Sequence, residues 1–247
     1  MTKRLLEVCI DSVASAVAAE KGRADRVELC ANLVEGGTTP SAGMIQAVRS
    51  AITIDLQVMI RPRGGDFLYT PEELDVMKRD IQMAKDLGAD GLVFGCLTAD
   101  AEVDKLVLAD LIGQSRPLNV TFHRAFDMVQ DWKKALEDLI DLGVDRVLTS
   151  GLAPDVIEGA VTLANIVSHA QGRIAILPGG GVRDYNIREL LQRTGASEAH
   201  VSGRKIVDSQ MKYRNANIHM GALQDAEYCT KVTDEKMIST FRKLLDS

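Results

Sequence analysis

The segment Gly88-Ala-Asp-Gly-Leu92 and three related segments decide the predicted fold, because each places a glycine between a helical pattern and a strand-like run. The other three are Gly22-Arg-Ala-Asp-Arg-Val27, Gly143-Val-Asp-Arg-Val147 and Gly195-Ala-Ser-Glu-Ala199. Glycine takes the left-handed backbone conformation at little cost, so it ends a helix and turns the chain back. The four segments therefore predict a weak repeat of helix-to-strand connections.

Eight strand candidates alternate with helical patterns, and their starts are about 28 residues apart on average. They are 5–10, 26–30, 56–62, 91–97, 119–125, 146–150, 174–178 and 198–203. Strict alternation predicts a parallel sheet with right-handed crossovers, and eight such units close into a barrel. We therefore predict an α/β protein with a single (β/α)8 TIM barrel domain over residues 1–247. An open doubly wound sheet is the alternative, because strand order cannot be read from the sequence.

Three further segments add detail to this prediction. Thr70-Pro71-Glu72-Glu73 marks a helix start, with an N-cap, a first-turn proline and a capping-box glutamate. Residues 206–232 are less regular, and we expect this segment to cover the barrel mouth or an oligomer interface. A final helix is predicted at 234–245.

The composition limits the class of protein. Hydrophobic residues make up 46% of the 247 residues and aromatic ones only 4%, which predicts an aliphatic core typical of parallel strands covered by helices. The formal net charge of −6 is spread along the chain, which argues against nucleic acid or an anionic membrane as the main partner. No stretch approaches the roughly 20 apolar residues of a membrane span, and no signal-peptide pattern opens the chain. We therefore expect a cytoplasmic protein.

Carboxylates and thiols share faces at the ends of the first two predicted strands. Alternate residues of a strand point to the same side, so Glu7 lies with Cys9 and Glu28 lies with Cys30. In a TIM barrel, the chemistry sits where the carboxyl ends of the strands meet the following loops. These four side chains are therefore expected at one working mouth.

Arginines and a histidine are predicted at the same end of the barrel. Arg61 and Arg63 lie at the end of the third strand, on one side of it, and we expect them to pair with Glu7 and Glu28, because buried charges need partners. His123 ends the fifth strand and is a candidate general base or ligand, with a buried, hydrogen-bonded histidine as the structural alternative. The whole set is either a neutralised polar plug or a site, and its clustering favours a site. For an enzyme, the candidate catalytic residues are Glu7, Glu28, Arg61 and His123.

Glycine-rich loops follow the seventh and eighth predicted strands. They are Pro178-Gly-Gly-Gly181 and Ser202-Gly203-Arg204-Lys205. In this fold these two loops commonly hold phosphate, because bare backbone N–H groups approach an anion closely. A glycine run alone also fits a tight turn. The predicted anion site, for a phosphate, sulfate or carboxylate, consists of Arg63, Ser150, Gly179, Gly180, Ser202 and Gly203.

Two of the four cysteines, Cys9 and Cys30, end neighbouring strands, and no Cys-x-x-Cys pair is present. Parallel neighbours lie about 4.8 Å apart, so the two thiols could hold a soft ion such as Cu(I). The alternative is that both are small buried apolar residues, as free cysteines usually are.

Several long motifs of this chain resemble those of the CutC family. They are Cys30-Ala-Asn-Leu-Val-Glu-Gly-Gly-Thr-Thr-Pro-Ser41, Ile60-Arg-Pro-Arg-Gly-Gly-Asp-Phe67, Thr121-Phe-His-Arg-Ala-Phe-Asp127, Arg146-Val-Leu-Thr-Ser-Gly151 and Tyr213-Arg214-Asn215. The resemblance implies a cytoplasmic barrel protein of copper homeostasis, a homo-oligomer such as a dimer or tetramer, with Cu(I) bound by thiols near the mouth. Cys9 and Cys30 stand where these motifs place the thiols.

Three functions compete at this point. The first is a copper homeostasis protein that binds Cu(I) through Cys9 and Cys30. The second is a TIM-barrel enzyme acting on a phosphorylated or carboxylated small metabolite, because the polar set is richer than a copper carrier needs. The third is a non-catalytic barrel that works as an oligomeric scaffold through the 206–232 segment.

Overall fold

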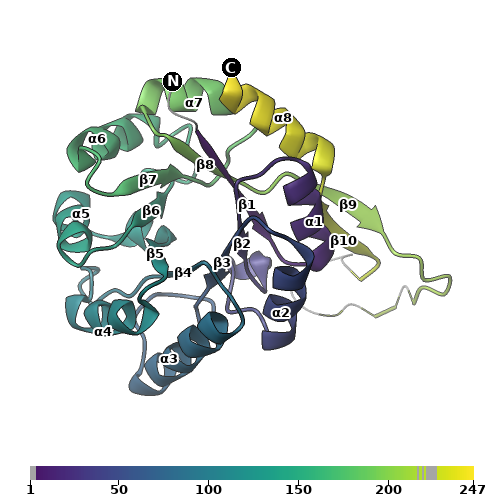
Figure 1. The fold of residues 1–247 in the computed structure, drawn as a ribbon, viewed down its shortest axis with the longest axis horizontal. Coiled ribbons are helices and arrows are strands. Elements are labelled where there is room, and N and C mark those ends of the chain that lie inside the picture. The colour runs from purple at the N-terminus through teal and green to yellow at the C-terminus, as the bar shows by residue number, and fades with distance from the viewer. Residues whose placement is uncertain (1–3, 216, 219, 221–226) are drawn as a thin grey trace.

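The protein forms a parallel eight-stranded barrel enclosed by helices, as a computed structural model describes it for residues 4–215, 217–218, 220 and 227–247 (Figure 1). The barrel strands are β1 (Leu5–Ile10), β2 (Arg26–Leu29), β3 (Asp55–Met59), β4 (Gly91–Phe94), β5 (Asn119–Phe122), β6 (Arg146–Thr149), β7 (Ala175–Pro178) and β8 (Glu198–Val201). The strands follow one another in sequence order, and β8 pairs with β1 in parallel. Packing of β7 against β8 completes the ring. This sequential order confirms the TIM barrel and makes the doubly wound alternative wrong.

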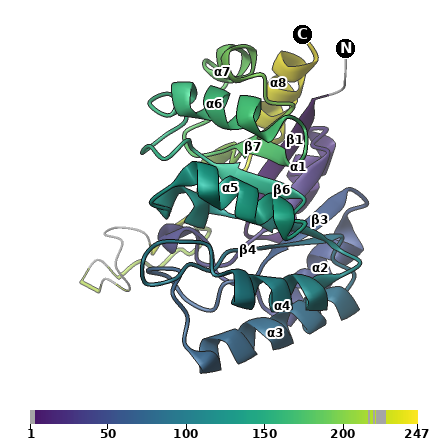
Figure 2. The same cartoon turned by 90° about the vertical axis from the view of Figure 1, so that its left-hand side faces the viewer.

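Helices follow the strands and form the outer layer, and Figure 2 shows α3 to α7 along one side. The helices are α1 (Val13–Lys21), α2 (Ala42–Ala51), α3 (Pro71–Asp86), α4 (Lys105–Ser115), α5 (Trp132–Asp141), α6 (Ala160–Ala170), α7 (Ile187–Thr194) and α8 (Glu235–Asp246), with short 3-10 turns η1 (Leu33–Glu35) and η2 (Arg124–Met128). Thr70 caps α3 in the predicted box with Glu73. No helix within the described part of the chain is long and apolar enough to cross a membrane.

Three of the four helix-ending glycines adopt the predicted left-handed conformation. Gly88, Gly143 and Gly195 have φ of +84°, +75° and +72°. Gly22 does not, since its φ is −73°, and Arg23 beside it takes the positive value instead. Gly22 is required for another reason: a Cβ there would lie 2.5 Å from the Cβ of Ile238 in α8. The left-handed conformation predicted for Gly22 is wrong. Glycine is needed at this position because α8 packs closely against it, not because the turn requires a positive φ.

Most barrel strands end one to three residues earlier than the sequence predicts. Ile60 and Cys96, for example, follow β3 and β4 but are 0% and 2% exposed. Buried residues in the first turn of a loop carry the same apolar signal as a strand, which explains the overestimate. The residues after each strand therefore belong to the loops that form the mouth.

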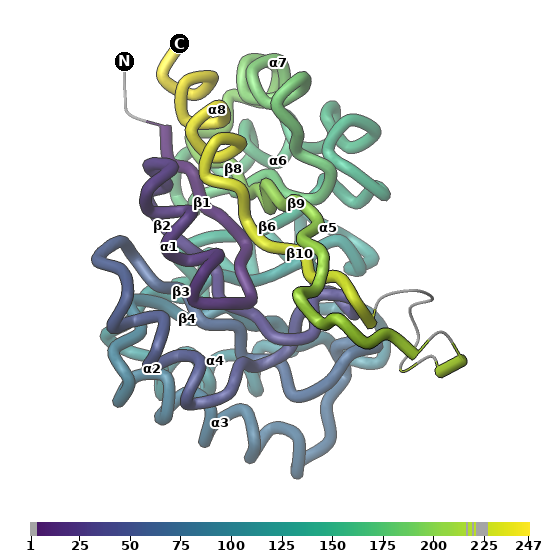
Figure 3. Tube along the Cα trace, turned by 90° about the vertical axis from the view of Figure 1, so that its right-hand side faces the viewer, coloured from purple at the N-terminus to yellow at the C-terminus, as the bar shows by residue number. Residues whose placement is uncertain are grey.

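The segment predicted to be irregular begins and ends in a β-hairpin. Strands β9 (Arg204–Asp208) and β10 (Cys229–Thr233) pair in antiparallel fashion, and Figures 1 and 3 show them extending away from the barrel beside α1. The backbone N–H of Thr233 donates to Ser15 Oγ of α1 at 3.1 Å, which fixes the base of the hairpin. The predicted terminal helix is present as α8. Residues 216, 219 and 221–226 of the predicted segment lie outside the described residues.

A layer of paired charges crosses the barrel interior near the amino ends of the strands. Arg26 of β2 bonds Glu7 of β1 and, at 2.7 Å, Glu198 of β8. Arg146 of β6 bonds the same Glu198 through two nitrogens, at 2.6 and 3.1 Å. All four side chains are nearly fully buried. The charges of these four side chains neutralise one another. Together they form the kind of polar plug that the sequence left as an alternative to a site, but the arginines in it are Arg26 and Arg146.

Candidate functional site

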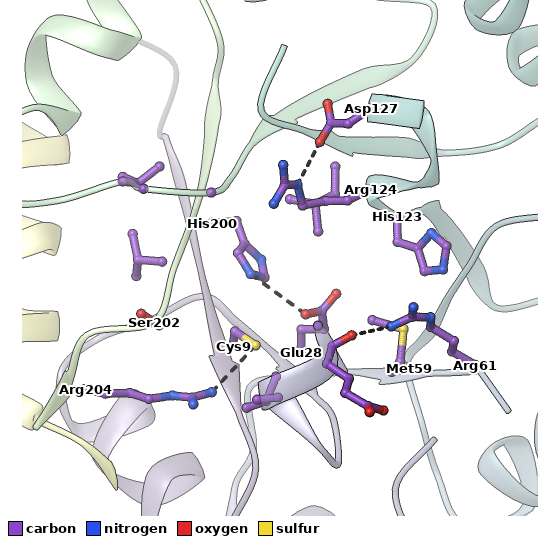
Figure 4. Close-up of a pocket in the computed structure, with 18 of the residues that line it drawn as sticks. Cys9, Glu28, Met59, Arg61, His123, Arg124, Asp127, His200, Ser202 and Arg204 are labelled. Atoms are coloured by element: carbon purple, nitrogen blue, oxygen red, sulfur yellow. Dashed lines mark hydrogen bonds and ion pairs between the residues drawn. The ribbon is translucent and has the colours of Figure 1, made fainter. Parts of the chain in front are cut away.

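A cavity of about 530 Å³ opens at the carboxyl ends of the strands, where TIM barrels carry their sites (Figure 4). Its wall includes Cys9 of β1, Glu28 of β2, Arg61 after β3, His123 after β5 and His200 of β8. Four of the strand-end residues predicted for the mouth, Cys9, Glu28, Arg61 and His123, therefore do meet around one space. Its size suits a small-molecule ligand.

The two thiols lie together at the edge of this cavity. One ligand atom each from Cys9, Glu28 and Cys30 lies within 4.8 Å of the others. Cys9 is 8% exposed and lines the cavity, whereas Cys30 is 1% exposed and is covered by the turn that contains Gly37. The predicted juxtaposition of Cys9 and Cys30 is present because β1 and β2 are hydrogen-bonded neighbours.

The two thiols have opposite acidities. A hydrogen bond from Cys30 holds the pKa of Cys9 well below the ordinary thiol value, against the effect of burial, and His200 and Arg204 lower it further. The same hydrogen bond, together with burial and the charge of Glu28, raises the pKa of Cys30 well above the ordinary value. Cys9 is therefore the more acidic thiol of the pair, and Cys30 the one that keeps its proton more strongly.

His200 connects the two buried carboxylates. Its Nδ1 lies 2.7 Å from Glu7 Oε1, and its Nε2 lies 3.8 Å from Glu28 Oε2. Burial favours neutral His200, but the charge of Glu28 and the bonds to Cys9 and Glu7 raise the pKa of His200 well above its ordinary value. Burial raises the pKa of Glu28 to about 8, above the ordinary carboxyl value. Glu7 behaves differently, because Arg26 and His200 overcome the effect of burial and hold its pKa far below the usual range.

Arg61 does not pair with Glu7 or Glu28 as the sequence predicts. Its Nη1 donates to the carbonyl oxygens of Glu35 and Gly37 at 2.8 and 2.9 Å, and its Nη2 donates to that of Gly65 at 2.8 Å. The guanidinium also lies over the ring of Phe67, 5.0 Å from its centroid. The predicted pairing of Arg61 with a carboxylate is wrong. The loop after β2 supplies backbone carbonyl groups that accept hydrogen bonds from its guanidinium instead.

Arg63 lies outside the cavity. Its Nε donates to Glu73 at 2.6 Å and its Nη2 to Asp66 at 3.0 Å, which ties the loop to the start of α3. The backbone after Met59 is no longer a strand, so the alternation that would place Arg63 beside Arg61 does not continue.

His123 is buried against the cavity wall. The backbone N–H of Ala125 donates to its Nδ1 at 3.2 Å, and the ring of Phe67 lies 4.8 Å away. Burial and the charge of Arg61 lower the pKa of His123 to about 3, so the ring is neutral. Because Nδ1 accepts a bond, the single ring proton sits on Nε2. That nitrogen is buried and has no hydrogen-bond partner among the described residues.

The predicted anion-site residues are only partly at the cavity. Gly180 and Ser202 line it, whereas Gly179, Gly203 and Ser150 are absent from its wall. A Cβ on Gly179 would meet Leu148, and one on Gly203 would meet Ile238, so both glycines serve close packing. Ser150 instead receives a bond from Arg124 Nη2 at 2.8 Å.

The structure adds cavity residues that the sequence reasoning did not assign to the site. Arg124 reaches over the mouth, held by Asp127 at 2.7 Å, and Arg204 approaches Cys9 with its Nη2 4.0 Å from the sulfur. His200, which lies in the eighth predicted strand, also lines the cavity. The sequence did contain a signal for Arg124 and His200, because both lie near the carboxyl ends of predicted strands. Arg204 lies in the hairpin, which the sequence did not predict.

The fold and the site together define a TIM-barrel protein with a thiol, carboxylate and imidazole cluster at its mouth. The chain belongs to the CutC family, whose family model matches residues 4–205. It is 53% identical over 241 residues to the human copper homeostasis protein cutC homolog, covering 97% of this chain and 88% of that protein. It is 48% identical to a family protein CutC of Parabacteroides distasonis, over 97% of this chain and 99% of that one.

A solved structure agrees with this assignment. The copper homeostasis protein CutC of Streptococcus agalactiae superposes with a TM-score of 0.78 at 37% identity, covering 81% of this chain and 98% of that chain. The family resemblance and the barrel predicted from the sequence are therefore both confirmed.

Proposed function

We propose that the protein binds Cu(I) through Cys9 and Cys30 at the barrel mouth and acts in copper homeostasis. The observation that carries this proposal is the buried thiol pair, whose sulfurs lie within 4.8 Å of each other beside Glu28. Soft thiolate ligands select Cu(I) over harder ions, and the ion accepts a two-coordinate site. The names of the human and streptococcal relatives point to the same process.

The surroundings of the pair suit this ion. A Cu(I) ion with two thiolates carries one net negative charge, and a buried charge needs a compensating partner. Arg204 lies 4.0 Å from the Cys9 sulfur, and the raised pKa of His200 keeps a second positive charge beside it. Cys9 is the more acidic thiol, so the proton that Cu(I) must displace from the pair is that of Cys30, which leaves when the second Cu–S bond forms.

A competition titration tests this proposal. Reduced protein is titrated with Cu(I) against a chromophoric Cu(I) chelator, together with the Cys9→Ser/Cys30→Ser double variant and the single variant Cys229→Ser as control. We expect one ion per chain, loss of binding in the double variant and unchanged binding in the control, whose cysteine lies in the hairpin. Equal affinity of wild type and double variant would remove this site from consideration.

The setting is part of the same proposal. We place the protein in the cytoplasm, where thiols stay reduced, and all four cysteines are free. We also propose a homo-oligomer, supported by the exposed apolar side chains of Ile206, Met211 and Tyr213 on the projecting hairpin. Light scattering coupled to size exclusion checks this, because a monomer at micromolar concentration contradicts it.

A second candidate function is acid–base chemistry on a phosphorylated or carboxylated metabolite. The observation that favours it is the contrast between neighbouring groups: Glu28 keeps a proton up to a pKa of about 8, while His123 stays neutral down to about 3. Such separated values allow one group to give and another to take a proton at the same pH. Turnover of a metabolite pool that disappears in Glu28→Gln tests it, and turnover that survives in this variant contradicts it.

A further inference from the structure

Arg61 is a buried cation without a carboxylate partner. Its side chain is 5% exposed, yet among the described residues no aspartate or glutamate forms an ion pair with it. Its three hydrogen bonds go to neutral backbone carbonyl groups. An unpaired buried charge is costly, so a folded protein normally supplies a counter-charge from a side chain or a ligand.

The donors of this cluster that lack an acceptor belong to two residues that line the cavity. A guanidinium has five N–H groups, and three are used here, so two remain, including the buried Nε–H that lacks a partner. The Nε2–H of His123 is a third buried donor without an acceptor. Arg61 and His123 both line the cavity, and Figure 4 shows them side by side on one wall, facing Glu28.

A ligand whose acceptors bond these donors must also match the charge of the cavity wall. The cavity is lined by Arg61, Arg124, Arg183 and Arg204, against the carboxyl groups of Glu28, Glu35 and Asp127. Asp127 is already paired with Arg124, so its charge is compensated within the wall. The wall therefore carries an excess of positive charge, which favours an anion.

We propose that this cavity binds a small molecule through an oxyanion, a carboxylate or phosphate group, held by the Nε–H and Nη2–H of Arg61 and the Nε2–H of His123. Paired guanidinium donors match both anions in bidentate geometry. Glu28 Oε1 is buried and has no partner among the described residues, so it is placed to bond a hydroxyl or carbonyl group next to the acid group. This site deepens the second proposed function by naming the residues that hold the acid group of its substrate, and it does not depend on copper.

Nuclear magnetic resonance of 15N-labelled, reduced, metal-free protein tests the site. Inorganic phosphate and glycolate are titrated separately at constant ionic strength, with chloride as the reference anion. We expect saturable shifts of the Arg61 Nε–H signal and of the His123 ring nitrogens for at least one probe. Saturation by phosphate alone assigns a phosphate ester, and saturation by glycolate alone assigns a hydroxy- or oxo-carboxylate. Saturation by neither probe, or shifts confined to surface residues, overturns the proposal.

Variants provide a second measurement. Arg61→Gln should lower the affinity for the saturating probe at least tenfold. The control is Arg49→Gln, which also removes guanidinium bonds to backbone carbonyls but lies outside the cavity, and it should leave this affinity unchanged. If Arg61→Gln fails to fold, His123→Asn takes its place, because asparagine keeps a side-chain acceptor for the Ala125 N–H and loses the Nε2 donor. Unchanged affinity in a folded variant also overturns the proposal. Binding without any turnover keeps the site and removes the second proposed function.

Discussion

Cys9 and Cys30 belong to one site but hold their protons differently, and this asymmetry has a measurable consequence. Cu(I) binding must displace the proton from Cys30, whose pKa lies well above the ordinary thiol value. Binding that releases a proton is strengthened by rising pH. We expect the apparent affinity for Cu(I) to increase about tenfold per pH unit between pH 6 and 8 for each proton released.

Chelator competition at several pH values, corrected for titration of the chelator, measures this dependence. The Cys229→Ser variant should show the same slope as wild type, because its thiol lies in the hairpin. An affinity that stays constant over this range would mean that no thiol proton leaves, which contradicts the assignment of Cys30 as a ligand.

His123 makes the stability of the fold depend on acid. Its pKa is lowered from the ordinary 6.5 to about 3. Between these two values, the imidazole is protonated in the unfolded chain but stays neutral in the folded chain. The free energy of unfolding therefore falls as the pH falls from 6.5 towards 3, by up to about 1.4 kcal/mol per pH unit from this residue.

Urea denaturation at pH 7.5, 6.0 and 5.0 measures this dependence, with His123→Asn for comparison. Between pH 6.5 and 5 the variant should lose less stability per pH unit than wild type, since asparagine does not titrate. Glu7, whose pKa is lowered, adds its own loss only below its ordinary value of 4.5. Equal slopes in the two proteins would show that His123 is protonated in the native state.

At the scale of elements, the turn between β2 and α2 holds Cys30 in place. Gly37 has a φ of +96°, and a Cβ there would lie 3.2 Å from the Cys30 sulfur. Gly37→Ala should therefore destabilise the protein by about 1–2 kcal/mol and weaken Cu(I) binding, because the strained turn displaces the thiol.

The control for this change is Gly43→Ala in α2, where a Cβ would meet nothing within 4 Å. Alanine inside a helix is preferred over glycine, so this variant should gain about 0.5–1 kcal/mol. Thermal or urea unfolding with Cu(I) titration distinguishes the two. A Gly37→Ala protein with wild-type stability and affinity would mean that the turn does not hold Cys30.

The elements also show where sequence reasoning succeeds and where it fails. Alternating patterns and glycine caps sufficed for the barrel, because they reflect the local backbone. They failed for Arg63, because the strand ends at Met59 and the alternation stops there. They could not reveal that Arg61 bonds carbonyl groups or that Arg26 takes Glu7, because side-chain partners depend on neighbouring strands and their register.

For the whole molecule, the charge layer joins strands from distant parts of the barrel. Glu198 of β8 is bonded by both Arg26 of β2 and Arg146 of β6. Glu198→Gln leaves Arg146 buried with no described carboxylate partner, so we expect a loss of about 3–5 kcal/mol in the free energy of unfolding. The exposed pair of Glu189 and Arg193 is a matched control, and Glu189→Gln should cost about 0–1 kcal/mol.

Urea unfolding of the two variants decides this point. Similar small losses in both would show that the buried layer tolerates an uncompensated arginine, and that the barrel depends on its apolar core alone. Thermal unfolding followed by circular dichroism checks the same ranking by a second route.

The central claim, that this CutC-family barrel binds Cu(I) through two thiolates at its mouth, is tested most directly by X-ray absorption at the copper edge. Protein loaded with one equivalent of Cu(I) under reducing conditions gives the elements in the first coordination shell. We expect two sulfur neighbours, both lost in the Cys9→Ser/Cys30→Ser variant. A shell of nitrogen and oxygen atoms only, or a sulfur shell that survives in the double variant, would contradict it.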